Sequence, residues 1–316
     1  MKISFVYNFK KIVNKIEMFL IRKKMILNNL LFVNSTCGEI NTILLYFPDY
    51  EMMHFGDHLF FEPLARYLKL NNFEVLVSPI PAMEFYFEEL GYPIFDNHTF
   101  ENVDLIVTKV EFLNCFKGLK NQILFVDTAS SKIGLPLCHD LIEKIAHILG
   151  LRKINYDPIP SYFDNYKEDA GFSLDKEKRY IIFNNYIDSG QVRSGTAHQN
   201  LIISFVTELK KKTGFDVIHT GSAKDKNNDT GKYNFVDIDL RGNTTIKGLF
   251  RLCANKSVVY NVSFDGFQMH LFFIKNKKSF ILFRGRFLKK NEKYIKNFVN
   301  PPFYHPNPTS LIEYIE

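Results

Sequence analysis

The chain has 316 residues, of which 46% are hydrophobic and 23% are charged, and its 40 Lys and Arg against 34 Asp and Glu give a net charge of +6. This composition is typical of a folded globular protein and excludes a disordered chain, a collagen-like repeat and a coiled coil. The length fits one large domain or two of ordinary size. The aromatic residues lie mainly in apolar runs and not between basic residues, so we expect no nucleic-acid partner.

Most of the net positive charge lies in the first 40 residues, where seven residues are Lys or Arg and two are acidic. Between Lys10 and Lys24, basic and apolar residues are interleaved at a spacing that approximates an amphipathic helix. Lysines interrupt every apolar run, which argues against a signal peptide and a transmembrane helix. Two interpretations stay open: residues 10–32 rest on the inner face of the cytoplasmic membrane, or they form a helix packed on the core.

From residue 42 onward, apolar runs alternate with longer amphipathic stretches. In the first half, this pattern predicts strands at 43–46, 73–77, 105–107 and 123–126, and helices at 58–70, 83–90 and 137–149. Residues 155–170 contain two prolines and little periodicity, as expected of a linker. The pattern then restarts, with strands at 180–183, 217–219, 258–260 and 280–283 and helices at 196–212, 245–253 and 267–274. The order predicts two α/β domains, each with a parallel sheet covered by helices.

Asp57 follows the first of these strands through a loop and comes just before the first helix. A carboxylate at the carboxyl edge of a parallel sheet could take a proton from a substrate hydroxyl. The simpler interpretation is that Asp57 is the N-cap of the helix, accepting a bond from its first amides. The two roles are compatible.

Three loops of the second half occupy equivalent places after strands. The loops at 188–193 and 220–224 combine small residues with a basic one, which could hold a phosphate at the positive end of a helix. Neither is a GxGxxG or Walker loop, so ordinary turns explain them equally well. In the third loop, at 265–270, Asp265 could be an N-cap and His270 a core histidine. The candidate ligand-binding residues in the first two loops are Ser189, Gly190, Arg193, Gly221, Ser222 and Lys224.

Several kinds of site are not expected. The four cysteines lie far apart and form no CxxC or Cys/His cluster, so neither a disulfide framework nor a zinc site is predicted, and a reducing compartment is the simplest interpretation. No HExxH or clustered histidine ligands occur, so we expect no metal. A GxGxxG turn is missing between Tyr46 and His58, which argues against a Rossmann dehydrogenase or epimerase.

The order of these motifs resembles the heptosyltransferase-like family of GT-B glycosyltransferases. The run at 55–68, FGDHLFFEPLARYL, is similar to the opening motif of that family, and 138–151 to its helix before the linker. The run DLRGNTT at 239–245 is similar to its "DL.G.TsL" stretch, and DGFQMH at 265–270 to its donor loop. The resemblance implies a GT-B fold of two Rossmann-like domains facing a central cleft.

The resemblance also implies an inverting, metal-independent sugar transfer from a nucleotide sugar. Asp57 matches the catalytic aspartate of the family, which deprotonates the acceptor hydroxyl. Asp265 matches a contact to the donor sugar, His270 a supporting histidine, and Gly242 and Asn243 the place of the nucleotide base. Arg193 is the basic residue nearest to the place of the family's diphosphate-binding lysine.

This chain departs from the family pattern in its donor loop, where Gly266 and Phe267 replace the usual Thr/Ser-Gly. We expect Phe267 to narrow the pocket. Because the loop is altered, an alternative hypothesis is a catalytically degenerate protein that binds a nucleotide sugar or glycan without turnover. The leading hypothesis is a cytoplasmic enzyme, peripheral on the inner membrane, that acts on glycan or lipid-linked acceptors of lipopolysaccharide or capsule. The expected segments are a basic extension (1–40), an acceptor domain (41–160), a donor domain (161–300) and a tail (301–316) packed on the N-terminal domain.

Overall fold

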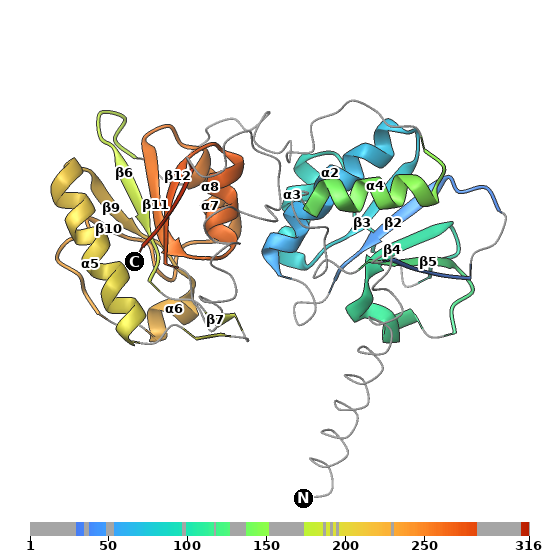
Figure 1. Cartoon of the computed structure of the whole chain (residues 1–316), viewed down its shortest axis with the longest axis horizontal. Coiled ribbons are helices and arrows are strands. Elements are labelled where there is room, and N and C mark those ends of the chain that lie inside the picture. Colours follow the sequence, from blue (N-terminus) through green and yellow to red (C-terminus); the bar gives the residue numbers. More distant parts are fainter. Residues whose placement is uncertain are drawn as a thin grey trace, which may run out of the picture. The chain divides into compact units, whose positions relative to one another are not determined.

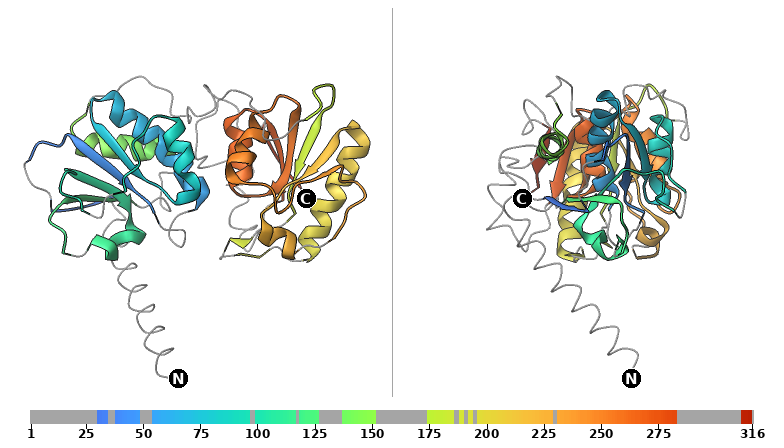
Figure 2. Two further views of the ribbon diagram at one scale, coloured as in Figure 1. Left: turned by 180° about the vertical axis from the view of Figure 1, so that it is seen from behind. Right: turned by 90° about the vertical axis from the view of Figure 1, so that its right-hand side faces the viewer.

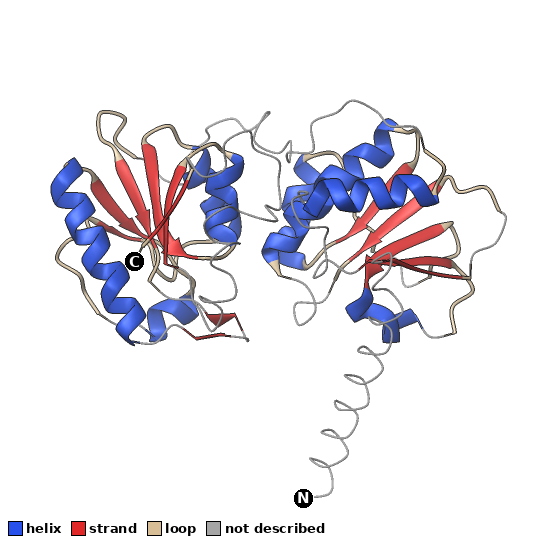
Figure 3. Cartoon of the chain, viewed as in Figure 1, coloured by secondary structure: helices blue, strands red, loops and turns tan. Residues whose placement is uncertain are grey.

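A computed structural model of the chain describes residues 30–34, 38–48, 54–96, 99–116, 118–126, 137–151, 174–185, 188–189, 192–193, 196–228, 231–282 and 311–315. The chain divides into two compact units, Met1–Pro158 and Ile159–Glu316 (Figure 1). In the described part of each unit, strands form a central sheet and helices pack against it (Figure 3). The predicted linker at 155–170 lies outside the described residues, as does the basic segment up to residue 29.

The first unit contains a sheet with the strand order β1-β5-β4-β2-β3. Its strands are β1 (Leu30–Val33), β2 (Thr42–Tyr46), β3 (Glu74–Ser78), β4 (Leu105–Lys109) and β5 (Gln122–Val126). All neighbours are parallel except β1, which pairs antiparallel with β5. Every residue of β4 and β5 is buried, as expected for parallel strands covered on both faces.

Helices follow the strands of the first unit, and all but the 3-10 helix after β4 are predicted from the sequence. They are α2 (Phe55–Leu70), the 3-10 turn Pro81–Met83 with α3 (Glu84–Glu89), the 3-10 helix Val110–Phe116, and α4 (Leu137–Ile148). Helices α2 and α4 pack against each other. On α2, the buried side chains include Leu59, Phe61 and Leu64, and these supply part of the core.

The strand β1 corrects the expected N-terminal extension. Residues 30–33 form the edge strand of the first sheet. The segment that the sequence analysis considers for a membrane surface, 10–32, overlaps this strand by three residues. Leu30 pairs with Val126 and Val33 with Ile123. An apolar run at this place therefore contributes to the fold of the first unit, and only the residues before it are left for a separate extension.

The second unit contains a parallel sheet of six strands with the order β10-β9-β6-β11-β12-β13. In chain order, this is the 3-2-1-4-5-6 arrangement of a doubly wound dinucleotide-binding sheet. The strands are β6 (Tyr180–Phe183), β9 (Asp216–His219), β10 (Ile238–Asp239), β11 (Val258–Phe264), β12 (Lys278–Leu282) and β13 (Ile312–Tyr314). A separate hairpin pairs β7 (Asp188–Ser189) with β8 (Val192–Arg193).

Helices cover both faces of the second sheet. Helix α5 (Thr196–Thr213) lies on one face, and α7 (Ile246–Ala254) and α8 (Phe267–Ile274) lie on the other, as two opposite views show (Figures 1 and 2). The short α6 (Ala223–Asn228) follows β9. On the α5 face, Ile202 and Val206 pack against Val262 and Phe264 of β11 in one apolar cluster.

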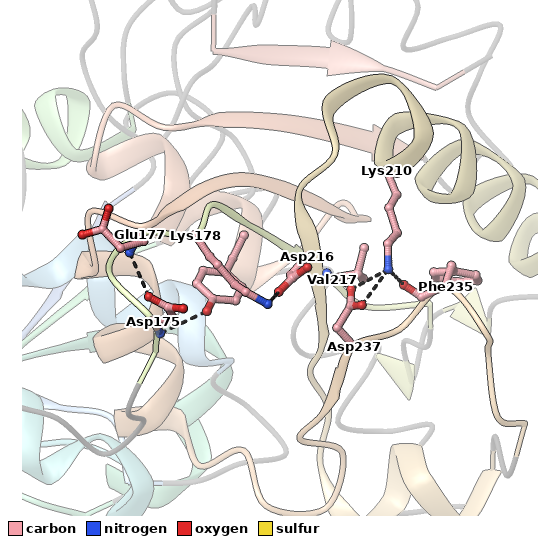
Figure 4. A network of polar contacts seen from close by, with 9 residues as sticks. Asp175, Glu177, Lys178, Lys210, Asp216, Val217, Phe235 and Asp237 are labelled. Atoms are coloured by element: carbon pink, nitrogen blue, oxygen red, sulfur yellow. Dashed lines mark hydrogen bonds and ion pairs between the residues drawn. The ribbon is translucent and has the colours of Figure 1, made fainter.

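The amino-terminal end of β9 is braced by polar contacts (Figure 4). Lys210 of α5 donates to both carboxylate oxygens of Asp237, at 2.8 and 2.6 Å, and to the carbonyl of Phe235. The Val217 amide donates to Asp237 Oδ2 at 2.7 Å. These contacts lie at the edge of the sheet opposite to the carboxyl ends of its strands, so they stabilise the unit away from any site at those ends.

The C-terminal strand corrects the expected packing of the tail. Residues 312–314 form β13, which pairs parallel with β12 of the second sheet, from Ser279 opposite Ile312 to Ile281 opposite Tyr314. The sequence analysis assigned the tail to a separate segment, and these residues instead belong to the sheet of the second unit. Without β13, the outer edge of β12 would have unpaired amides and carbonyls. Pairing with β13 satisfies them.

Candidate active site

The strand order of the first sheet reverses between β2 and β4, because β2 connects outward to β3 and the chain then returns to β4 on the other side. In open parallel sheets, ligands bind outside the carboxyl ends of the strands at such a point. Here β2 ends at Tyr46 and β4 at Lys109. Helix α2, which follows β2, carries Asp57 in its first turn. The predicted catalytic residue therefore belongs to the switch point of its sheet.

The carboxylate of Asp57 is held from two directions. Lys109 Nζ donates to Asp57 Oδ2 at 2.8 Å, and the backbone amide of His54 donates to the same oxygen at 3.1 Å. The two side chains are 8% and 15% exposed, so this is a largely buried ion pair that still reaches solvent on the aspartate side. Both bonds are made to Oδ2, and neither involves Oδ1.

Asp57 is not the N-cap of α2. The N-cap is His54, and Asp57 is the third residue of the helix, so its side chain reaches back to the N-cap amide as in a capping box. The helix begins at Phe55, three residues earlier than the sequence predicts, because Gly56 and Asp57 join its first turn. Asp57 thus caps α2 and also presents an oxygen at the sheet edge.

His58 fixes the backbone around Asp57. Its ring is fully buried, its Nδ1 lies 3.0 Å from the carbonyl of His54, and the amide of Ile80 donates to its Nε2 at 3.2 Å. Because Nε2 accepts this bond, the proton of the neutral ring is on Nδ1 and is donated to His54. Burial lowers the pKa of His58 to about 4, against the smaller effect of the His54 carbonyl. A neutral His58 therefore ties the start of α2 to the segment after β3.

Lys109 is a residue of this candidate site that sequence analysis missed. It ends the run Leu-Ile-Val-Thr-Lys of β4, where a charged residue follows four residues suited to a buried strand. The prediction ended this strand at residue 107, so it did not bring Lys109 to the sheet edge beside the loop after β2. A strand extended by two residues would have placed a cation next to the candidate aspartate.

The second sheet has its own switch point, between β6 and β11. Beyond the end of β11, Asp265 and Gly266 lead into α8, whose N-cap is Gly266. Glycine has no side chain to cap the helix, and the positive end of a helix favours an anion. The N-cap interpretation of Asp265 is wrong, since that residue precedes the cap. Asp265 and His270 are both partly exposed, so His270 is not a fully buried core histidine.

Phe267 contacts a neighbouring helix. Its ring meets that of the fully buried Phe250 of α7 edge-on, with centroids 5.7 Å apart. This contact orients Phe267 toward the packing between α7 and α8. The substitution of a small residue by Phe267 in the loop thus contributes to helix packing.

Two other predicted loops are brought together at the carboxyl ends of β9 and β10. The amide of Gly242 donates to the carbonyl of Gly221 at 2.9 Å, so the loops that hold Ser222 and Asn243 are neighbours. Gly242 has a φ of +80°, a left-handed conformation that favours glycine. A side chain at Gly221 would meet Asp225 at 3.0 Å.

In the loop after β9, some hydrogen-bonding groups are paired with residues of the same loop. Asp225 accepts a bond from the Ser222 amide at 2.5 Å, and the Asp225 amide donates to Ser222 Oγ at 3.2 Å. The Ser222 amide and hydroxyl therefore have partners within their own loop. Lys224 is exposed.

The hairpin of β7 and β8 contains the third predicted group. Ser189 pairs with Val192, and Asp188 with Arg193, in an antiparallel ladder. The backbone of Ser189 and Arg193 is thus set in a short turn after β6. Gly190 lies outside the described residues, and no side-chain position is described for Ser189 and Arg193.

A polar chain links the first three strands of the second sheet at their carboxyl ends. His219 Nε2 lies 2.9 Å from Asn185 Oδ1, and Asn185 Nδ2 donates to the hydroxyl of Tyr233 at 3.0 Å. Arg241 lies over the Tyr233 ring and donates to Asp239 Oδ1 and Oδ2 at 3.0 and 2.8 Å. The Arg241 guanidinium lowers the pKa of Asp239 to about 2. These contacts fix the backbone just before Gly242.

Within the described ranges, no group of three or more His, Cys, Asp and Glu residues is arranged to hold a metal ion. Among the helices in the same ranges, none is both long enough and apolar enough to cross a bilayer.

The fold of this chain is that of GT-B glycosyltransferases. A glycosyl transferase family 9 structure from Veillonella parvula matches with a TM-score of 0.55 and 11% identity, over 89% of this chain and 89% of that chain. The ADP-heptose lipopolysaccharide heptosyltransferase II of E. coli matches with a TM-score of 0.52 and 17% identity, over 87% of this chain and 90% of that chain. No family model and no curated protein matches the sequence. The predicted fold class, and the predicted resemblance in fold, are confirmed.

Proposed function

We propose that this protein is an inverting, metal-independent glycosyltransferase that moves a sugar from a nucleotide-sugar donor to a glycan or glycolipid acceptor. The observation that carries the proposal is the Asp57 carboxylate at the switch point of the first sheet, held through Oδ2 by Lys109 and the His54 amide. A positioned carboxylate with one oxygen oriented for a partner is the arrangement that general-base catalysis requires. The fold shared with glycosyltransferases supplies the reaction class.

In this mechanism, the first unit binds the acceptor. Asp57 Oδ1 accepts the proton of an acceptor hydroxyl while the hydroxyl oxygen forms a bond to the anomeric carbon of the donor. The bond from that carbon to the diphosphate oxygen breaks on the opposite side, and the nucleoside diphosphate leaves. A single displacement inverts the anomeric configuration, and the proton remains on Asp57.

The second unit binds the donor. The amino-terminal end of α8 stabilises negative charge on the diphosphate, since a helix N-terminus favours an anion. Asp265 contacts the donor sugar and His270 supports it. Gly242 and Asn243 hold the base, and the residues of the two other loops complete the site. Ser189, Gly190, Arg193, Gly221, Ser222 and Lys224 are the proposed members of those loops.

The proposed acceptor belongs to a bacterial surface glycan such as lipopolysaccharide or capsule. The E. coli relative is an ADP-heptose lipopolysaccharide heptosyltransferase, so ADP-heptose is the first donor to test. A lipid-linked acceptor fits a cytoplasmic enzyme whose basic N-terminal segment contacts the inner membrane surface.

The membrane contact is tested by deleting residues 1–29, because a longer deletion would remove β1 from the sheet. Co-sedimentation with vesicles containing anionic phosphatidylglycerol is compared with neutral phosphatidylcholine vesicles at low and high salt. Loss of anionic-vesicle binding at low salt supports the contact. Unchanged binding by the deletion variant contradicts it.

The second candidate is a protein that binds a nucleotide sugar or glycan without turnover. The favouring observation is that the Asp57 carboxylate already serves as a cap and as an ion-pair partner, which gives it a structural role of its own. Transfer assays with ADP-, UDP- and GDP-sugars, in the presence of EDTA, distinguish the two. Release of nucleoside diphosphate with an acceptor-dependent rate and an inverted product favours the enzyme. Calorimetric binding with no turnover favours the second candidate.

A further inference from the structure

A cluster of buried polar side chains lies at the switch point of the second sheet, where α8 packs on β11. We call Thr220, Asn261, Gln268 and Ser279 the Gln268 cluster. Their side chains are between 0% and 8% exposed. Thr220 follows β9, Asn261 lies within β11, Ser279 lies within β12, and Gln268 is in the first turn of α8. The cluster therefore joins the two halves of the sheet.

The Gln268 amide bridges this cluster. Thr220 Oγ1 donates to Gln268 Oε1 at 3.1 Å, and Gln268 Nε2 donates to Asn261 Oδ1 at 2.6 Å. Asn261 Nδ2 in turn donates to Ser279 Oγ at 3.1 Å. The Thr220 hydroxyl also lies 3.3 Å from the carbonyl of Phe183, and its single proton is closer to Gln268 Oε1. In this amide orientation, Thr220, Gln268 and Asn261 each donate to an oxygen of the cluster, so the network is directional.

Thr220 is itself fixed to β6. Its amide donates to the carbonyl of Phe183 at 2.9 Å, and its carbonyl accepts a bond from Asn184 Nδ2 at 3.1 Å. The Thr220–Gln268 bond thus crosses the switch point from the β6 and β9 half to α8. It couples the loop that begins at Gly221 to the helix that begins after Gly266.

Packing alone does not require a glutamine here. Later buried residues of α8, including Leu271, Phe272 and Phe273, are apolar, and burying an amide is costly unless it is fully bonded. Apolar contacts allow a helix to shift and rotate slightly, whereas hydrogen bonds of fixed direction set its orientation. Gln268 lies in the first turn of α8, and the amides of this turn are the ones proposed to bind the diphosphate.

We propose that Gln268 is a positioning residue for the donor: it sets the direction of the first amides of α8 relative to the loop after β9. This inference rests on the proposed function, because it assigns those amides to the donor diphosphate. Small displacements of preorganised groups lower binding and catalysis strongly. Loss of the bridge should therefore weaken donor binding more than it weakens the fold.

The test measures the Kd of ADP, GDP and UDP by calorimetry, in the full-length chain. Gln268→Leu removes both bonds at similar volume, and Thr220→Val removes one of them. We expect each variant to raise the Kd of the preferred nucleotide about five- to tenfold. Thr220→Ser keeps the hydroxyl and should bind within about twofold of the wild type. Because the two residues share one bond, the double variant should lose less than the product of the single losses.

A matched control lies at the opposite edge of the same sheet. Lys210→Met removes the contacts to Asp237 and Phe235 (Figure 4), which stabilise the amino-terminal end of β9. This control should lower the Tm and leave the nucleotide Kd unchanged. Hydrogen exchange gives a second comparison. Gln268→Leu should raise the exchange rate of the amides at 219–222 and 265–269. Lys210→Met should raise it at 215–217 and 235–237.

The outcomes separate the two proposals. If the wild type binds none of the nucleotides and none of their sugars, the proposed function fails and this inference with it. If the wild type binds and folded Gln268→Leu binds equally well, the proposed function stands and the positioning role is wrong. An equal loss of affinity in Lys210→Met would also overturn the positioning role, since general loss of stability would then explain both variants. If Gln268→Leu does not fold, the nucleotide Kd of Thr220→Val is compared with that of Thr220→Ser. Equal values would mean that the positioning role is wrong.

Discussion

Asp57 and Lys109 lie on different elements of the first sheet and form an ion pair of 2.8 Å at its switch point. The aspartate belongs to the first turn of α2, and the lysine is the last residue of β4. The lysine holds Oδ2 together with the amide of His54, so the direction of Oδ1 is set by the fold. This pair links the architecture of the first unit to the proposed chemistry.

The first prediction concerns the lysine of this pair. Lys109→Met leaves Asp57 as a largely buried charge without its cation, so the free energy of unfolding should fall by about 3 kcal/mol. Transfer activity should fall about tenfold or more, because Oδ1 loses its fixed direction. Urea unfolding and initial rates measure the two effects.

Lys211→Met is the matched control for Lys109→Met. Its pair with Glu208 is 68% exposed on both sides, so its loss should change stability by less than about 0.5 kcal/mol and leave activity intact. If Lys109→Met behaves like this control, the ion pair has no role in holding Asp57.

The second prediction concerns the pH dependence of stability through His58. Burial lowers its folded pKa to about 4, below the ordinary value of 6.5. Between these pKa values, the unfolded chain binds a proton at His58 that the folded chain does not. The contribution of neutral His58 to stability is therefore fully present above pH 6.5 and is lost as the pH falls toward 4. The full loss from this residue is about 3 kcal/mol.

His58→Gln tests this prediction, since glutamine can accept from the Ile80 amide and donate to the His54 carbonyl without titrating. Urea unfolding between pH 7 and pH 4 should have a shallower pH dependence in this variant. The same slope in both proteins would mean that His58 is not the group responsible.

The third prediction concerns Asp239, whose folded pKa is lowered to about 2 by the hydrogen bonds and charge of Arg241. Its contribution to stability is present above the ordinary value of 3.8 and is lost as the pH falls from there toward 2. Asp239→Asn should be less stable than the wild type at pH 7, and the difference should shrink in this acid window. Because the side chain is 40% exposed, we expect only about 1 kcal/mol. A difference that does not vary with pH would contradict the assignment.

The fourth prediction concerns the free thiols. Burial raises the pKa of Cys253 to about 12, and this residue is fully buried, whereas Cys115 is exposed. In the native protein, iodoacetamide at pH 8 should modify Cys115 and spare Cys253, and urea should expose both. Peptide mass mapping identifies the sites. Rapid native labelling of Cys253 would contradict the packing of α7.

The sequence predicts most of the fold because buried strands and amphipathic helices have clear patterns. The strand at 180–183 and the helix at 267–274 have the predicted bounds. Strand β11 was predicted too short, ending at Tyr260, because the polar residues Asn261 and Ser263 interrupt its apolar run. Both belong to the hydrogen-bonded network under α8, so their burial depends on partners that are distant in sequence.

The candidate site was predicted in part. The sequence identifies Asp57 and the loop at Asp265 from their places after strands, and the structure assigns each to the switch point of its sheet. The partner Lys109 is 52 residues from Asp57 along the chain, and only strand pairing brings the two together. The orientation of Phe267 toward Phe250 likewise depends on the packing of two helices.

The most direct measurement is the transfer rate of Asp57→Asn compared with that of the wild type. Asparagine keeps an oxygen that can accept from the His54 amide and from Lys109, so α2 should keep its cap. The loss of the charge beside the largely buried Lys109 should lower the Tm, so the rates are compared at a temperature where both proteins are folded. Asparagine cannot accept the proton of an acceptor hydroxyl, so the rate should fall roughly a hundredfold to ten-thousandfold. A folded Asp57→Asn variant that transfers sugar at the wild-type rate would contradict the account.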